Sequence, residues 1–148
     1  MCRSLFLPTL AGFAVFYGWV LCAQAVKGGG DARIIGCPPS PNCVSTVSLD
    51  EAHWIASLPF GVSPNEAFDC LLQILRHMKR TTIMVAEEGF IHAEVRTLLG
   101  FVDDVTFQVD SDSRTIHMRS ASRIGYWDLG VNRRRLEAIR AAFDIKCR

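Results

Sequence analysis

The side chains best suited to bind a ligand are concentrated between residues 119 and 135. The segment contains five arginines, two glycines and two aromatic residues, and it reads Arg119-Ser-Ala-Ser-Arg-Ile-Gly-Tyr-Trp-Asp-Leu-Gly-Val-Asn-Arg-Arg-Arg135. A planar guanidinium donates two parallel hydrogen bonds to a carboxylate or phosphate. The segment therefore predicts non-catalytic binding of an anionic small molecule or an acidic protein partner. The candidate ligand-binding residues are Arg119, Ser122, Arg123, Asp128 and Arg134.

Three of these arginines occupy an unfavourable position. Arg133 to Arg135 fall in the first turn of a predicted helix, where positive charge opposes the helix dipole. A bound anion or an acidic partner surface would compensate, and so would ion pairs with Asp103, Asp104 or Asp128. Internal pairing and external binding both remain open.

A second set of polar residues alternates with apolar ones in three short segments, which predicts one polar face on a sheet. An alternative hypothesis is therefore an enzyme in which His92 or His117 acts as a general base and Glu94 orients it. A solvated sheet face explains the same pattern without chemistry. The residues expected on this face are His92, Glu94, Arg96, Thr106, Gln108, Thr115, His117 and Arg119.

Familiar catalytic and metal-binding patterns are missing from the sequence. It has no Gly-x-Ser-x-Gly, phosphate-binding glycine loop or His-Glu-x-x-His. Asp103 and Asp104 are adjacent, so in a strand they would point to opposite faces, and we expect them to end a turn. We assign no catalytic residue, metal or cofactor. Whether the protein is an enzyme stays open, leaning towards no, and a structural or assembly module is the third alternative.

Four cysteines follow the first 25 residues, an even number that favours disulfides in an exported protein. Cys37 and Cys43 enclose a turn-rich segment with three prolines, which predicts a local disulfide between them. Cys70 and Cys147 either pair or serve as small buried apolar groups.

The elements that must position these residues follow from periodicity. Ser63 and Pro64 begin a helix as cap and first residue. Strands are expected at 81–86, 91–96, 105–109 and 115–119, and a last helix at 132–143 with Asn132 as its N-cap. The predicted fold class is α+β: a two-layer sandwich with a four-stranded antiparallel sheet and two helices on one face, in the order α-β-β-β-β-α.

The N-terminal residues predict export. No charged residue occurs from residue 4 to residue 26, a stretch of 23, and Ala23-Gln24-Ala25 fits a signal-peptidase site. The stretch is also long enough to span a bilayer. We predict a signal peptide or N-terminal membrane anchor at 1–25, a flexible linker at 26–36 and a single α+β domain at 37–148. We expect an exported protein that is either periplasmic or otherwise extracytoplasmic, or anchored in the membrane.

Charge excludes one class of partner. The chain has 16 basic and 15 acidic residues. Without Arg3 the remaining chain is neutral and lacks the positive field of a general nucleic-acid binder. We therefore predict no nucleic-acid partner, and membrane contact through the N-terminal segment if it is uncleaved.

Several motifs, in order, resemble the family known as domain of unknown function 1499. The resemblance implies an exported or membrane-associated protein, as found in bacteria with relatives in plastids, and it carries no established activity. Trp127 departs from it, where a small polar residue is expected. Cys70 and Cys147 lie outside the motifs, which supports Cys37–Cys43 as the disulfide that matters. The motifs are Cys37-Pro-Pro-Ser-Pro-Asn-Cys43-Val-Ser-Thr46, Ile91-His-Ala-Glu94, Gly100-Phe-Val-Asp-Asp-Val105, Ser120-Ala-Ser-Arg-Ile-Gly125 and Asp128-Leu-Gly-Val-Asn-Arg-Arg-Arg135.

Overall fold

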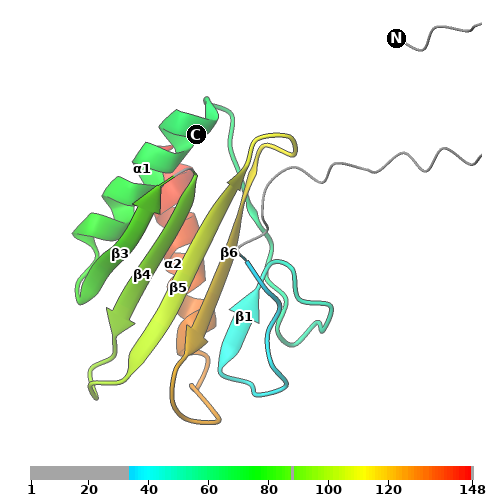
Figure 1. Ribbon diagram of the computed structural model, residues 1–148, viewed down its shortest axis with the longest axis vertical. Helices are drawn as coiled ribbons and strands as arrows, with labels where there is room; N and C mark the ends of the chain where they lie inside the picture. The colour runs from blue at the N-terminus through cyan, green and yellow to red at the C-terminus, as the bar shows by residue number, and fades with distance from the viewer. Residues whose placement is uncertain (1–33, 88, 148) are drawn as a thin grey trace, which may run out of the picture. The chain divides into compact units, whose positions relative to one another are not determined.

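A computed structural model describes residues 34–87 and 89–147, which belong to a compact unit spanning 31–148 (Figure 1). Two helices pack on one side of a six-stranded sheet, and no helix of the described residues covers the other side. The helices are α1 (Pro64–His77) and α2 (Val131–Lys146). The strands are β1 (Cys43–Ser45), β2 (Leu58–Pro59), β3 (Thr81–Glu87), β4 (Phe90–Arg96), β5 (Val102–Asp110) and β6 (Thr115–Ser122).

The alternating strands behave as predicted. Ile91, Val105 and Phe107 face the helices and are at most 1% exposed. They join apolar residues of both helices, including Leu71 and Leu136, in one core. Burying an aliphatic or aromatic side chain of this size contributes about 1.5–3 kcal/mol, so this layer holds the sheet against the helices.

The predicted sheet of four strands was wrong in number. The strand order is β1-β6-β5-β4-β3, and the two-residue β2 also pairs with β6. β1 and β2 are too short to show alternation, and β2 contains Pro59, a residue that disfavours strands. Both exist because the long strand β6 offers them backbone partners, which is a tertiary effect. The α+β class, the two helices and the antiparallel pairing are confirmed.

The start of α1 follows the prediction. The Ser63 hydroxyl accepts a hydrogen bond from the Glu66 N–H, the Glu66 carboxylate accepts one from the Ser63 N–H, and Pro64 is the first helical residue. This reciprocal capping satisfies two otherwise unpaired backbone donors. Cys70 of α1 forms a disulfide with Cys147 after α2, so the two helices are covalently joined.

The start of α2 differs from the prediction. The helix begins at Val131 with Gly130 as its N-cap, so Asn132 is not the cap. The Asp128 carboxylate instead accepts hydrogen bonds from the N–H groups of Gly130 and Asn132, both at 2.8 Å. An aspartate two residues ahead of the cap satisfies the same donors. This releases the Asn132 side chain to point into the protein, where it is fully buried.

The expectations for residues 1–25, and for most of the linker, lie outside the described residues. Ile34, where the description begins, is 6% exposed, so the packed domain starts before Cys37. Among the described residues no helix is both long and apolar enough to cross a membrane.

Candidate functional site

Two neighbouring aspartates divide the polar residues at one end of the sheet into two groups. Asp103 and Asp104 lie near the start of β5, inside the strand and not at a turn as expected. Because successive side chains alternate across a strand, Asp103 points to the helix face and Asp104 to the outer face. Their exposures differ accordingly: the Asp103 side chain is 1% exposed and that of Asp104 is 27% exposed.

On the helix face, Asp103 belongs to a buried hydrogen-bond network with Ser120, Asn132 and Arg135, which we call the inner network. The Arg135 guanidinium donates to Asp103 Oδ2 at 2.5 Å, to Ser120 Oγ at 2.9 Å and to Asn132 Oδ1 at 2.7 Å. Ser120 Oγ donates to Asn132 Oδ1 at 2.6 Å. Removing one partner from such a buried ion pair typically costs 3–5 kcal/mol. The inner network therefore joins α2 to the centre of the sheet.

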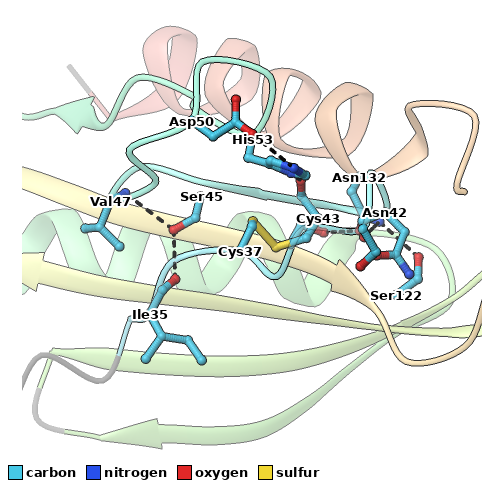
Figure 2. The surroundings of a disulfide bond; sticks show 12 residues. Ile35, Cys37, Asn42, Cys43, Ser45, Val47, Asp50, His53, Ser122 and Asn132 are labelled. Carbon is cyan, nitrogen blue, oxygen red and sulfur yellow. Dashed lines mark hydrogen bonds and ion pairs between the residues drawn. A yellow bond between two sulfur atoms is a disulfide. The ribbon is translucent and has the colours of Figure 1, made fainter. Parts of the chain in front are cut away.

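Asn132 extends this network to the segment that holds the first disulfide. Its side-chain amide donates to the Asn42 carbonyl at 2.9 Å, and to Ser122 Oγ at 3.0 Å. Figure 2 shows Asn42 and Asn132 beside the Cys37–Cys43 disulfide, which confirms that predicted pair. Cys43 begins β1, so the disulfide fixes the turn that leads into the sheet edge.

On the outer face, four charged or titratable side chains form a second group, His92, Glu94, Asp104 and Arg123, which we call the outer cluster. Arg123 donates to both Asp104 oxygens at 2.8 Å and to Glu94 at 2.5 Å. His92 Nε2 lies 2.8 Å from Asp104 Oδ1. The Arg123 hydrogen bonds, more than the one from His92, hold the pKa of the Asp104 carboxyl below its ordinary value, and the two carboxylates raise the pKa of Arg123.

Arg119 differs from every other arginine in the candidate set. It lies on the outer face of β6, partly buried, and its side chain forms no hydrogen bond or ion pair within the described residues. Its Nε is buried without a partner. Burial lowers the pKa of the guanidinium, and the nearby charge of Asp104 only partly opposes this. A buried donor without a partner costs free energy, and no described residue offsets that cost at Arg119 Nε.

The register places Arg119 in a row of polar side chains across the outer face. Arg119 pairs with Thr106 of β5, and Thr106 pairs with His92 of β4. Directly opposed side chains have Cβ atoms about 5 Å apart, so the row spans about 10 Å. The Thr106 hydroxyl likewise has no hydrogen bond within the described part of the chain. The row thus offers a guanidinium, a hydroxyl and an imidazole to one small ligand.

The five predicted ligand-binding residues do not converge. Arg119 and Arg123 are on the outer face, whereas Ser122 accepts from Asn132 and Asp128 caps α2. Arg134 donates to the Leu129 carbonyl at 2.8 Å. In the arginine run, Arg133 donates to the Ala52 carbonyl and Arg135 to Asp103, so all three have partners inside the domain. The run needs no external anion to explain it.

The predicted histidine trio does not meet either. Glu94 binds Arg123, and His92 binds Asp104. His117 of β6 lies 3.2 Å from Thr46 Oγ1 and 3.8 Å from Asp110 Oδ2, and β5 separates it from His92. Among the described residues, no group of three His, Cys, Asp or Glu side chains could hold a metal ion.

Sequence reasoning named Asp103 and Asp104 only as possible ion-pair partners of the arginine run, and the Arg135–Asp103 pair confirms one of these pairings. It gave no role in the site to Asn42 or Thr106. Thr106 was placed on the correct face, but nothing in the sequence distinguished its row from the rows beside it. The aspartates had no signal in the alternation, because Asp103 puts a polar residue on the face where Val105 and Phe107 are apolar, and the pattern therefore stopped at Val105. Asn42 carried no signal, since its partner lies 90 residues away.

Comparison with protein-family models matches residues 33–143 to the family described as Protein of unknown function (DUF1499). The chain belongs to this family. No curated protein and no solved structure matches it. In this DUF1499 protein, each motif that carries the resemblance contributes to one end of the sheet: Asn42 and Cys43, His92 and Glu94, Asp103 and Asp104, Ser120 and Arg123, and Asp128 to Arg135.

Proposed function

We propose that this protein is a non-catalytic binding domain of the cell envelope that takes a small carboxylate or phosphate on the outer face of its sheet, at Arg119. The observation that supports this most strongly is the partly buried Arg119 guanidinium, which lacks a partner among the described residues and has a buried Nε. Arginine geometry matches planar carboxylates and phosphates.

The outer cluster would position this site. Arg123 is held by Asp104 and Glu94, so with a neutral His92 the outer cluster carries one net negative charge. Arg119 adds a positive charge to the same face, beside the Thr106 hydroxyl. This shifts the proposed site from the loop that follows β6 to β6 itself. Of the five residues predicted from the sequence, Arg119 becomes the central one.

An exported or membrane-tethered location is part of the proposal. It is supported by the uncharged stretch at residues 4–26 and by the two disulfides, which persist in oxidising compartments. All core residues and both disulfides belong to the unit 31–148, so this unit serves as the soluble form for experiments.

The test is a thermal-shift titration of residues 31–148 with inorganic phosphate, phosphosugars, nucleotides and small carboxylates. A ligand at about 100 times its Kd stabilises the folded state by about 2.7 kcal/mol, which corresponds to roughly 10 °C in Tm. We expect Arg119→Met to abolish the shift while preserving most of the apolar packing of the side chain. Arg96→Met is the matched control, because it removes an exposed positive charge from β4. A shift that survives Arg119→Met would refute this site.

One observation favours a second candidate, acid–base chemistry by His92. The carboxylate of Asp104 lies 2.8 Å from its Nε2 and is itself fixed by Arg123, the kind of support that orients a catalytic imidazole. Against it, no hydroxyl in the described part of the chain is hydrogen-bonded to His92, and the four cysteines that follow residue 33 are all in disulfides. Once a ligand is known, turnover that His92→Gln abolishes without weakening binding would establish an enzyme.

A further inference from the structure

Two loops lie side by side at the end of the sheet that holds the inner network and the outer cluster. Residues 97–101 connect β4 to β5, and residues 123–130 connect β6 to α2. The Arg123 N–H donates to the Val102 carbonyl at 3.1 Å, which joins the start of the second loop to the end of the first. Figure 1 shows both loops at the same end of the molecule.

Both loops expose large apolar side chains, which we call the apolar tip. In a folded domain, single exposed apolar residues are ordinary, but a group on adjoining loops marks an interaction surface. None of these residues belongs to the core. The side chains of the tip are 47–85% exposed, and they are Leu98, Leu99, Phe101, Ile124, Tyr126, Trp127 and Leu129.

The backbone of the second loop holds one of these side chains in an unfavourable conformation. Leu129 has φ 55°, in the left-handed region that glycine and asparagine adopt far more readily than leucine. Its side chain is 64% exposed, so burial inside the domain does not repay this conformation. An exposed leucine held in the left-handed conformation suggests that its side chain contacts something outside the domain.

We propose that the apolar tip inserts into the surface of a lipid bilayer containing anionic lipids. Tryptophan and tyrosine favour the membrane–water interface, and leucine, isoleucine and phenylalanine partition below it. Arg96 and Arg134 are exposed beside the two loops, where they can meet acidic headgroups. Asp128 is the loops' one acidic residue, and its carboxylate is occupied by the N–H groups of Gly130 and Asn132.

The sequence outside the described residues supports a lipid occupant. The uncharged stretch at residues 4–26 is long enough to cross a bilayer. If it stays attached, the seven residues 27–33 bridge at most about 25 Å, so lipid is within reach of the domain. The inference does not rest on the proposed anion site, because Arg119 and Thr106 are not part of the apolar tip.

The experiment is vesicle binding by residues 31–148, with vesicles of phosphatidylcholine alone or mixed with phosphatidylglycerol. In a Trp54→Phe background, Trp127 is the one tryptophan of this unit. We expect its emission to shift to the blue, and the protein to sediment with the mixed vesicles more than with the neutral ones. Brominated lipids should quench the emission if the side chain enters the acyl region.

A matched pair of variants makes the test specific. Leu98→Ser, Leu99→Ser and Tyr126→Ser together should lower the partition coefficient more than tenfold, because three large apolar contacts are lost. Met84→Ser with Ile145→Ser removes two other exposed apolar side chains, on β3 and near the end of α2, and should leave it unchanged.

Three results would overturn the proposal. One is the absence of sedimentation with either vesicle. Another is an equal loss of binding in the control variant. The third is a concentration-dependent dimer that the Leu98/Leu99/Tyr126 variant abolishes, which would mean that a second copy of the chain covers the apolar tip.

Discussion

Asp103 and Asp104 are consecutive residues, and each pairs with an arginine, yet the two pairs occupy different environments. Arg135 and Asp103 are 7% and 1% exposed at the side chain, whereas Arg123 and Asp104 are 43% and 27% exposed. The inner pair is enclosed by Ser120 and Asn132, and the outer pair is shared with Glu94 and His92.

The difference in exposure implies different contributions of the two faces of the sheet to stability. In the inner network Arg135 pairs with Asp103 Oδ2 while Asp103 Oδ1 is buried without a hydrogen-bond partner, and the buried pair fixes α2 to the sheet. Exposed ion pairs contribute little to stability, so the outer cluster can be arranged around a ligand at small cost to the fold. Arg119, whose Nε has no partner among the described residues, lies on the outer face, where we propose that a ligand binds.

The largest effect should come from breaking the inner pair. We expect Asp103→Asn to lower the free energy of unfolding by about 3–5 kcal/mol, because Arg135 is left buried with an uncompensated charge. Urea denaturation of residues 31–148 measures it. The double variant Asp103→Leu with Arg135→Met should lose less unfolding free energy than Asp103→Asn, because no charge is left buried without a partner. A loss in the double variant as large as that of Asp103→Asn would contradict this explanation.

The disulfides extend the comparison. Cys70–Cys147 closes a separation of 77 residues and joins the helix layer, whereas Cys37–Cys43 closes a separation of 6. Chain entropy predicts a loss of about 4.5 kcal/mol for Cys70→Ala with Cys147→Ala, and about 2 kcal/mol for the corresponding Cys37 and Cys43 variant. Unfolding of both double variants under oxidising conditions checks the order, and a reversed order would show that strain or packing dominates.

Breaking the outer pair should have a small effect. Arg123→Gln is expected to lower the free energy of unfolding by less than about 1 kcal/mol, because the pair is partly exposed to water. Chemical denaturation next to the Asp103→Asn variant makes the comparison direct. A loss of 3 kcal/mol or more would mean that the outer cluster is structural, like the inner network.

The smallest effect is a pH dependence from Asp104. Arg123 and then His92 hold the pKa of this carboxyl below its ordinary value of 3.8 in the folded state. As pH falls, the unfolded chain takes up the proton first, so this contribution is complete above about pH 4 and lost as pH falls through the folded-state pKa. Asp104→Asn should therefore flatten the loss of stability as the pH falls below about 4. Asp112→Asn, on the exposed β5–β6 turn, serves as control, and an unchanged slope in Asp104→Asn would rule out this contribution.

The sequence was sufficient for the local elements and for the faces of the strands. Residues such as Ile91 and Phe107 alternate with polar neighbours, and Ser63-Pro64 is a strong helix start, so period and capping predicted them. β1 and β2 were not predicted, because these short strands form only through their pairing with β6. Asn132 was misread as a cap because Asp128 supplies the same acceptor from two residues before Gly130.

The site was less predictable than the fold. The arginine content of residues 119–135 was plain, but which guanidinium has no partner depends on contacts across β4, β5 and β6. Arg123 reaches Glu94 over 29 residues and Arg135 reaches Asp103 over 32. No local sequence pattern indicates pairings across about 30 residues. The arginine-rich loop was therefore predicted as the site, and Arg119 was only one of its five candidate residues.

We proposed that the inner network is structural and that the outer face binds an anion at Arg119. The most direct test is an NMR titration of residues 31–148 with inorganic phosphate and with acetate, followed through backbone amide and arginine Nε–H signals. The account predicts saturable shifts at Arg119, Thr106 and His92, and unchanged signals at Arg135 and Asn132. Shifts confined to residues 123–135, or none at tens of millimolar anion, would contradict it.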